Sequence, residues 1–314
     1  MKVAVLIPVY NAACYLRQCL DSVLAQNGVN LEVFCRDDGS ADASGDILAE
    51  YANREGRVHA VSQTNVGVSE TRNRLLDGLP PGFDAVAFVD SDDWIAPGMY
   101  ARLAEALERT GADIAECEWG GPERIVRDMS VYWLQQTAPG RWINVINKLY
   151  RPSAIGAVRF RSGLKFEEDY FFNFEVNARA KSKVLVPGCF YTYRDNPDSA
   201  THALNHADYF ASTSRRILLS LELFLEAGRV PANLMRRFRK ELSQDIFRMC
   251  VRKNLRRNPN SADRRELFAK AGMFLRGLED RGFSAVGLSP VQRMVLACCK
   301  SGRYAPARAL AYLT

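Results

Sequence analysis

The sequence has no long run of apolar residues. None of its hydrophobic stretches approaches the roughly 20 residues that a helix needs to cross a bilayer, although 47% of its 314 residues are hydrophobic. The first apolar stretch, Val3 to Ile7, is broken at once by Pro8 and is too short for a signal peptide. We therefore expect a protein that neither spans a membrane nor is secreted, with a substantial buried core.

The sequence also lacks Cys-x-x-Cys pairs, although it contains eight cysteines. Cys35, Cys189 and Cys250 lie in apolar surroundings. Such use of cysteine as a small hydrophobic residue is typical of a reducing compartment. The sequence therefore predicts a cytoplasmic protein.

Strand and helix patterns alternate over residues 1–110. Apolar runs predict strands at Val3 to Ile7, Leu31 to Cys35, Val58 to Val61 and Ala85 to Val89. Helical patterns separate them, at Tyr15 to Ala25, from a cap at Asp42 or Ser44 to Asn53, and at Ser69 to Leu79. This alternation predicts an α/β fold with a mainly parallel sheet, helices on both faces, and ligands beyond the carboxyl ends of the strands.

Two further regions follow this alternation. Residues 111–205 are rich in aromatic side chains, and a short strand pair is predicted around Val184 to Tyr193. Residues 206–314 show helical patterns, for example at Ser214 to Glu226 and Asn233 to Leu255. We predict one domain over residues 1–205, divided near residue 110, and a helical C-terminal region over residues 206–314.

Three carboxylates, Asp90, Asp92 and Asp93, follow the strand that ends at Val89. Burying carboxylates this close together without a partner would cost several kcal/mol, so a positive group is expected among them. A hard divalent cation with oxygen ligands is the simplest candidate. The alternative is an Asp-rich turn that leads into a helix from Met99 onward.

Polar residues also follow the other predicted strands, as Tyr10-Asn11 and Asp37-Asp38-Gly39. Because the carboxyl ends of parallel strands meet at one edge of a sheet, these residues should converge with Asp90 to Asp93. The sequence therefore predicts a binding site at this edge.

These motifs resemble those of family 2 glycosyltransferases of the GT-A fold. They are Ile7-Pro8-Val9-Tyr10-Asn11, Asp37-Asp38-Gly39-Ser40, Asn65-Val66-Gly67-Val68-Ser69 with Arg72-Asn73, and Asp90-Ser91-Asp92-Asp93. Three later segments resemble the bacterial surface-polysaccharide branch of that family. They are Asn147-Lys148-Leu149-Tyr150, Leu164 to Asp169 and Tyr191-Thr192-Tyr193-Arg194. The resemblance covers residues 1–205 and implies a nucleotide-sugar half, 1–110, and an acceptor half, 111–205.

The resemblance implies transfer of a sugar, with inversion, from a nucleoside-diphosphate sugar to a glycan or lipid-linked acceptor in cell-surface polysaccharide synthesis. Pro8, Val9 and Tyr10 would form the floor under the nucleobase. Asp38 would accept a hydrogen bond from the base, which favours uracil and hence a UDP-sugar. Arg72 would lie near the diphosphate or the base edge. The remaining donor-binding residues would be Asp90 and Ser91, with Asp90 touching the ribose or supporting a metal.

The resemblance also implies a metal and a base. Asp92, with Asp90, would bind Mn²⁺ or Mg²⁺ at the diphosphate. Inversion needs one general base; this would be Asp169 or, because Glu167-Glu168-Asp169 leaves the register open by one, Glu168. The same acidic triplet would also suit a helix N-terminus.

Two further residues have alternative interpretations. His202 would be either a further metal or phosphate ligand or a surface histidine. Lys148 would either approach phosphate or be solvated. The sequence departs from the family pattern at Arg36-Asp37, Glu70-Thr71 and Arg74. These positions would surround the donor pocket, so the identity of the donor sugar is not predicted.

The segment from Arg236 to Lys270 is strongly basic, with twelve Lys or Arg against four Asp or Glu, in a chain of net charge +6. It would either attach the protein peripherally to the anionic inner face of the cell membrane or form a solvated helical cap. No recognised nucleic-acid-binding module accompanies the charge, so nucleic-acid binding is not expected.

Two other functions are weighed against the transferase. A nucleotidyltransferase would normally show a Gly-rich loop after the first strand, and Pro8-Val9-Tyr10-Asn11 is not one. A catalytically inactive relative could act as a nucleotide-binding or assembly subunit, although Asp90, Asp92 and Asp169 are all present.

Overall fold

A computed structural model describes residues 1–118, 121–127, 129, 144–163, 168–188, 190–196, 240, 243, 247, 261–280 and 288–301. The chain divides into two compact units. The first consists of Met1–Trp133 and Trp142–Pro197, and the second of Leu134–Arg141 and Asp198–Thr314. The domain boundary predicted at residue 205 lies outside the described residues and stays a prediction.

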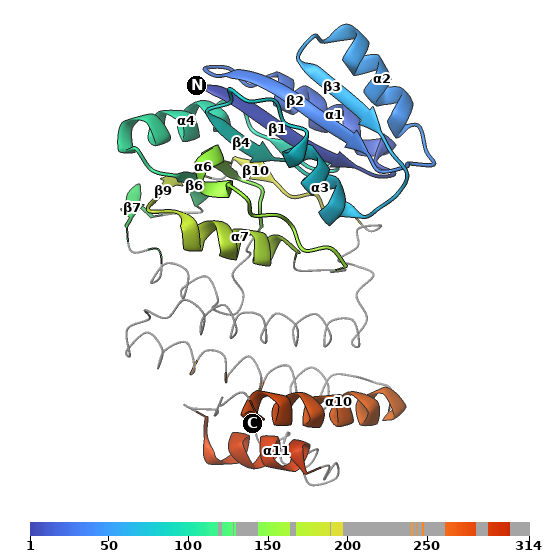
Figure 1. Cartoon of the computed structure of the whole chain (residues 1–314), viewed down its shortest axis with the longest axis vertical. Coiled ribbons are helices and arrows are strands. Elements are labelled where there is room, and N and C mark those ends of the chain that lie inside the picture. Colours follow the sequence, from blue (N-terminus) through green and yellow to red (C-terminus); the bar gives the residue numbers. More distant parts are fainter. Residues whose placement is uncertain are drawn as a thin grey trace. The chain divides into compact units, whose positions relative to one another are not determined.

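The first unit contains an eight-stranded sheet in the order β3-β2-β1-β4-β8-β6-β9-β7 (Figure 1). Parallel pairing joins β1 to β2, β2 to β3, β1 to β4 and β6 to β9, whereas β8 runs antiparallel to β4 and β6, and β7 antiparallel to β9. The predicted mainly parallel sheet is therefore confirmed. Its strands are β1 Lys2–Val9, β2 Asn30–Asp37, β3 Val58–Ser62, β4 Ala85–Phe88, β6 Ile114–Glu118, β7 Arg124–Val126, β8 Lys148–Tyr150 and β9 Lys183–Pro187.

Helices cover both faces of this sheet (Figure 1). Successive side chains of a strand point to opposite faces, and every residue from Val3 to Ile7 in β1 is 0% exposed, so β1 is covered on both sides. The sequence predicted helices on both faces from the alternation of strand and helix patterns. The described part of the first unit contains the helices α1 Ala13–Leu24, α2 Ser44–Arg54, α3 Val68–Asp77, α4 Met99–Thr110, α6 Pro152–Ile155 and α7 Glu168–Arg179.

The strand pair predicted around Val184 to Tyr193 is wrong in its pairing. Strand β9 pairs with β6 and β7, whereas β10, Tyr191–Thr192, forms a separate two-stranded sheet with β5, Trp94–Ile95. The chain leaves the large sheet at Gly188, whose backbone has a φ of 137° and whose N–H bonds Glu118. Ala96 N–H then bonds the Phe190 carbonyl, so residues 190–192 run beside the segment that follows Asp93.

The second unit contains α10, Ser261–Asp280, and α11, Pro290–Lys300. A capping box of Ser289 and Gln292 begins α11. A Cβ at Gly272 of α10 would lie 2.5 Å from the Cys299 carbonyl oxygen of α11, so this glycine permits close approach of the two helices. No helix in the described part of the chain combines the length and the hydropathy needed to cross a bilayer. The helix predicted at Ser214 to Glu226, most of that at Asn233 to Leu255, and most of the basic segment lie outside the described residues.

The turns that follow β1 and β2 are hydrogen-bonded to each other. Asn11, which has a φ of 48°, donates its N–H to Ser40 Oγ at 2.9 Å and accepts the Ala41 N–H at 2.8 Å. The side chains of Asp42 and Ser44 accept N–H groups of residues 13 and 12, and the residue that caps α2 is Ala43, without a side-chain bond. The predicted cap at Asp42 or Ser44 is thus wrong, since the cap position between them is Ala43. Asp42 nevertheless bonds the start of the helix, because its Oδ1 accepts the Ser44 N–H at 3.0 Å.

Gly39 lies at the centre of these turns. Its φ is +73°, which an L-residue rarely adopts. A Cβ there would lie 2.9 Å from the Asn65 backbone nitrogen and 3.2 Å from the Gln63 oxygen. The turn after β2 therefore packs directly against the segment that leads into α3.

We expect Gly39→Ala to lower the free energy of unfolding by about 1–3 kcal/mol, because it combines left-handed backbone strain with a backbone clash. Gly56→Ala is the control, since no atom lies within 4 Å of its would-be Cβ, and should stay within about 0.5 kcal/mol of the parent protein. Urea denaturation measures both. Equal effects of the two substitutions would contradict direct packing of Gly39 against the segment before α3.

Candidate active site

One buried arginine forms ion pairs with three carboxylates. Arg72 lies in α3, and its side chain is only 4% exposed. Its Nη2 lies 2.7 Å from Asp90 Oδ1, and its Nη1 lies 2.9 Å from Glu168 Oε1 and 2.8 Å from Asp169 Oδ1. Of the three carboxylates after β4 among which a positive group is expected, Asp90 is paired with this arginine. Its predicted contact with a diphosphate or base stays a prediction.

These ion pairs join segments that are far apart in the sequence. Glu168 and Asp169 are 96 and 97 residues from Arg72, and Asp90 follows β4 at the carboxyl edge of the sheet. Both acidic residues lie in the first turn of α7, where carboxylates suit the helix dipole. The helix N-terminus and the convergence of carboxylates thus occur together. Glu167 lies outside the described residues.

The environment of Asp169 favours its protonated form. Burial is the largest cause and raises its pKa to about 7, with Glu168 and Asp90 acting in the same direction. Arg72 and the Val145 N–H, 3.3 Å from Asp169 Oδ2, oppose this shift. A carboxyl group whose pKa lies near neutral pH can exchange protons under physiological conditions.

Phe160 contacts both Arg72 and its neighbour Asn73. Asn73 Nδ2 donates to the Phe160 carbonyl at 2.8 Å, and Phe160 N–H donates to Asn73 Oδ1 at 2.7 Å. The Phe160 ring centre lies 5.2 Å from the Arg72 guanidinium, within cation–π range. Asn73 thus acts like a peptide group that pairs α3 with the segment before α7.

The residues after β4 are bonded to residues 191–196. Asp93 is 1% exposed and accepts hydrogen bonds from the Tyr191 hydroxyl at 2.7 Å and the Arg194 N–H at 2.8 Å. Burial, followed by repulsion from Asp90, raises the pKa of Asp93 to about 7. Arg194 Nε donates to the Asp92 carbonyl, and Asn196 Nδ2 lies 3.0 Å from Asp92 Oδ2. The sequence singled out Tyr191 to Arg194 as a motif without revealing these contacts.

The predicted metal ligands are placed only in part. Asp92 Oδ2 accepts from Asn196, Asp90 Oδ1 accepts from Arg72, and His202 lies outside the described residues. Within the described part of the chain no group of three or more His, Cys, Asp or Glu residues is arranged around a common metal position. The oxygen donors of Asp90 and Asp92 fit Mg²⁺ or Mn²⁺ chemically, and the metal assignment stays a prediction.

Asp38 is 3% exposed and fixes the segment that leads into α3. Its Oδ1 accepts from Gln63 Nε2 and the Val66 N–H, and its Oδ2 accepts from the Gly67 N–H, each at 2.8 Å. An ionised carboxylate has about four acceptor positions, so three protein bonds leave about one for a ligand. Its predicted bond to a nucleobase stays a prediction.

Gln63, which the sequence reasoning missed, links several of the departures from the family pattern. Its Oε1 accepts from Arg36 at 3.2 Å and Arg74 at 3.0 Å, and its Nε2 donates to Thr71 at 2.9 Å as well as to Asp38. Arg74 also bonds Glu70. Arg36, Glu70, Thr71 and Arg74, which depart from the family pattern, are thus joined through Gln63 into one polar network beside Asp38. Only the three-dimensional pairing of β3 with β2 brings Gln63 to this place.

The other predicted donor-binding residues lie at the same edge. Pro8 and Val9 are buried at the end of β1, and Tyr10, just beyond them, is 54% exposed. Ser91 is half-buried in the turn after β4. Of the predicted floor residues, Tyr10 therefore presents the most side-chain surface to a ligand.

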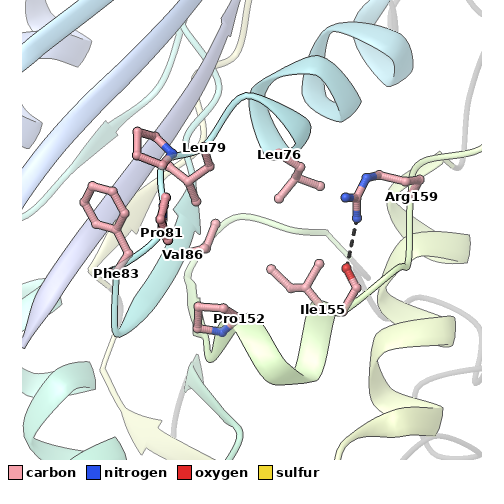
Figure 2. A pocket seen from close by; sticks show the side chains of 11 residues that line it. Leu76, Leu79, Pro81, Phe83, Val86, Pro152, Ile155 and Arg159 are labelled. Atoms are coloured by element: carbon pink, nitrogen blue, oxygen red, sulfur yellow. Dashed lines mark hydrogen bonds between the residues drawn. The ribbon is translucent and has the colours of Figure 1, made fainter.

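A cavity of about 340 Å³ is lined mainly by apolar side chains, and its lining includes none of these carboxylates (Figure 2). Its lining includes Leu76, Leu79, Phe83, Val86 and Ile155. Val86 is near the start of β4, whereas Asp90 follows the end of that strand. The cavity therefore does not coincide with the predicted donor site.

Comparison with known proteins identifies the family. The family model described as "Glycosyl transferase family 2" matches residues 4–166. The chain belongs to glycosyl transferase family 2. It is similar to the glycosyltransferase GlyA of Streptococcus pneumoniae, with 30% identity over 70% of this chain and 35% of GlyA. It is also similar to EpsJ, an uncharacterized glycosyltransferase of Bacillus subtilis, with 28% identity over 63% of this chain and 62% of EpsJ. The matched stretch thus spans less than two thirds of either relative.

A solved structure supports the GT-A fold. The chain is similar to residues 1–349 of S. aureus TarS in complex with UDP-GlcNAc, with a TM-score of 0.75 and 19% identity. The match covers 99% of this chain and 91% of that one. The fold predicted from the resemblance to family 2 glycosyltransferases is therefore confirmed.

We expect Arg72→Met to lower the free energy of unfolding by about 3–5 kcal/mol, because it leaves three close carboxylates without their buried counter-charge. Arg74→Met, two residues along α3, removes an arginine whose side chain is 41% exposed and should cost less than about 1 kcal/mol. Urea denaturation at neutral pH compares them. A cost for Arg72→Met no greater than that for Arg74→Met would contradict the proposed role of the ion pairs.

Proposed function

We propose that this family 2 member is an inverting glycosyltransferase that uses a nucleoside-diphosphate sugar, specifically a UDP-sugar. The observation that carries the proposal is the convergence of Asp90, Glu168 and Asp169 on Arg72. It brings the carboxyl edge of the sheet, where nucleotides bind in such folds, beside a carboxyl group whose pKa is about 7. A donor-binding edge and a general base are the two parts that the reaction needs.

In this proposal Asp169 is the general base. It would accept the proton from the acceptor hydroxyl as that oxygen attacks the anomeric carbon on the face opposite the leaving diphosphate, which inverts the configuration. Glu168 is the alternative base, because it shares the Nη1 of Arg72. Arg72 would hold both carboxylates in position during the reaction and favour the ionised form of Asp169.

Asp92, supported by Asp90, would hold a divalent cation. When bound, Mn²⁺ or Mg²⁺ would neutralise charge on the departing diphosphate. Asn196 donates to the Asp92 carboxylate and would fix its orientation, whereas Arg194 donates to the Asp92 backbone carbonyl and would fix the main chain there. His202 is kept as a further candidate ligand.

The donor assignment rests on Asp38 and Tyr10. Asp38 retains acceptor capacity for the imide N–H of uracil, and the exposed Tyr10 ring could stack on the base. The complex of TarS with UDP-GlcNAc supports a UDP-sugar. Pro8, Val9 and Ser91 complete the proposed donor set.

We propose a glycan or lipid-linked acceptor in bacterial cell-surface polysaccharide synthesis. The resemblance of residues 147–150 and 191–194 to that branch of the family supports this class. The protein would act in the cytoplasm or peripherally at the inner face of the membrane, where the basic segment of residues 236–270 would meet anionic lipid.

Thermal stabilisation by nucleotides tests the donor assignment. UDP at a hundred times its dissociation constant should stabilise the protein by about 2.7 kcal/mol in the presence of Mn²⁺. The shift should shrink without metal and in Asp92→Ala. Stabilisation only by other nucleoside diphosphates would overturn the uracil assignment, and no shift with any nucleotide would overturn the proposed donor site.

We expect Asp169→Asn to slow transfer by about a hundredfold to a thousandfold, equivalent to about 3–4 kcal/mol. The folded-state pKa of Asp169 is raised from 3.8 to about 7, so its ionisation lowers stability progressively as the pH rises between these values, and the cost is complete above about pH 7. Asp169→Asn, which replaces this carboxylate by a neutral amide, should therefore not lower the melting temperature at pH 8. Loss of activity together with a large loss of stability would argue for a structural role instead.

The pH profile of kcat/KM tests the same group. Activity should fall as the pH drops through about 7, because protonation of Asp169 removes the base. Glu168→Gln is the comparison, since it changes the neighbouring carboxyl group and should shift this limb to lower pH without abolishing it. A profile that stays flat from about pH 5.5 to about pH 8, a range that spans this pKa, would contradict Asp169 as the base.

A further inference from the structure

We propose that Lys148 is a positioning residue for Asp169: its buried ammonium group fixes the turn of residues 144–147, which in turn holds the carboxylate of the base. This inference rests on the proposed function. Lys148 begins β8, and its side chain is only 4% exposed. Neither interpretation from the sequence, a phosphate contact or a solvated lysine, describes its surroundings.

The ammonium group of Lys148 faces the acceptors of this turn. Its Nζ lies 2.8 Å from the Asn144 carbonyl, 3.3 Å from the Ile146 carbonyl and 2.7 Å from Asn147 Oδ1. A longer contact of 3.4 Å joins Nζ to Asn144 Oδ1. The ammonium group thus faces four acceptors on residues that precede the lysine by one to four positions. Because no other side chain carries three rotatable donors at one point, a lysine suits this turn better than a neutral residue of similar size.

The turn is unusual in its backbone as well. Asn147 has a φ of 60°, in the left-handed region that non-glycine residues seldom adopt. Its Nδ2 also donates to the Cys117 carbonyl at 2.9 Å. Both the strained residue and its side chain are therefore held by specific bonds, one of them to Lys148.

The far side of the turn contacts the base. Val145 N–H points at Asp169 Oδ2 at 3.3 Å, and the Asn144 carbonyl accepts from Asn173 Nδ2 at 2.8 Å. Asn173 Nδ2 also lies 3.0 Å from the Asp169 carbonyl, one helical turn before it in α7. Lys148 and Asp169 thus act on opposite sides of one short segment.

The charged groups around Lys148 come from three elements. Glu116 of β6 lies 3.6 Å from its Nζ, Lys183 of β9 bonds the other oxygen of Glu116 at 2.7 Å, and Asp169 lies at the start of α7. Burial is the largest influence and lowers the pKa of Lys148 to about 8; Lys183 acts in the same direction, and both carboxylates oppose it. When Lys148 loses a proton, its amino group loses its positive charge and one of the N–H donors that bond the turn of residues 144–147.

Lys183 supplies the matched control. It is also a buried lysine, 1% exposed, and it contacts the same Glu116. Its position in β9 places it beyond the turn of residues 144–147. Lys148→Met and Lys183→Met therefore remove equivalent charges, but only the first removes the donors of the turn.

The test compares kcat, the donor KM and amide exchange in the two variants. We expect Lys148→Met to lower kcat about ten- to a hundredfold, as displacement of a catalytic group does, with the donor KM changed less than about threefold. Lys183→Met should change kcat less than about threefold. The alkaline limb of the kcat profile, expected as Lys148 loses its proton near pH 8, should disappear in Lys148→Met and persist in Lys183→Met.

Hydrogen exchange gives a readout that does not depend on transfer. The Val145 amide should exchange at least about tenfold faster in Lys148→Met than in Lys183→Met, because its turn has lost its donors. If this holds in a protein without transfer activity, the proposed function fails while the structural link stands. Equal exchange in the two variants, or an unchanged kcat for Lys148→Met, would overturn the inference. If Lys148→Met does not fold, Lys148→Gln, which keeps one amide donor group, takes its place under the same criteria.

Discussion

The ion pairs of Arg72 with Asp90, Glu168 and Asp169 are the interaction on which the site depends. Three carboxylates at this spacing repel one another, and a buried guanidinium with several N–H donors is suited to hold them together. Because Asp90 follows a strand and the other two begin a helix, these bonds also fix the position of α7 against the edge of the sheet. The same residues affect the pKa of Asp169: Glu168 and Asp90 raise it, and Arg72 lowers it. The ion pairs that hold the structure together therefore also influence the proposed base.

The surrounding contacts support this arrangement. Asn73 holds α3 against the Phe160 backbone, and Tyr191 with Arg194 anchors residues 191–196 to Asp92 and Asp93. Each is a buried or half-buried polar contact whose partners are satisfied by one another, as a low-dielectric environment requires. On the other side, Lys148 supports the turn beside Asp169. The base is thus approached by α3, by the 144–147 turn and by α7, and this triple support is typical of a preorganised site.

Much of the fold could be predicted because its signals are local. Apolar runs predicted β1 and β4, and a largely apolar run predicted β2. The polar residues that follow these strands indicated the edge where Asp38 and Asp90 lie. The common partner of Asp90, Glu168 and Asp169 could not be predicted, since Arg72 meets Asp169 across 97 residues. Gln63 was missed for the same reason, because its role appears only when β3 pairs with β2. The wrong pairing for β10 and the wrong cap for α2 arose because local propensity does not specify which distant group a side chain will bind.

A double-mutant cycle between Arg72 and Asp169 tests most directly whether their ion pair organises the site. The free energy of unfolding is measured for the parent, Arg72→Met, Asp169→Asn and the double variant at pH 8. If the ion pair organises the site, the double variant should be more stable than the sum of the single effects predicts, by about 0.5–3 kcal/mol, the range typical of residues in one network. Additivity within about 0.3 kcal/mol would show that the two side chains act independently, and it would contradict an organising role for Arg72.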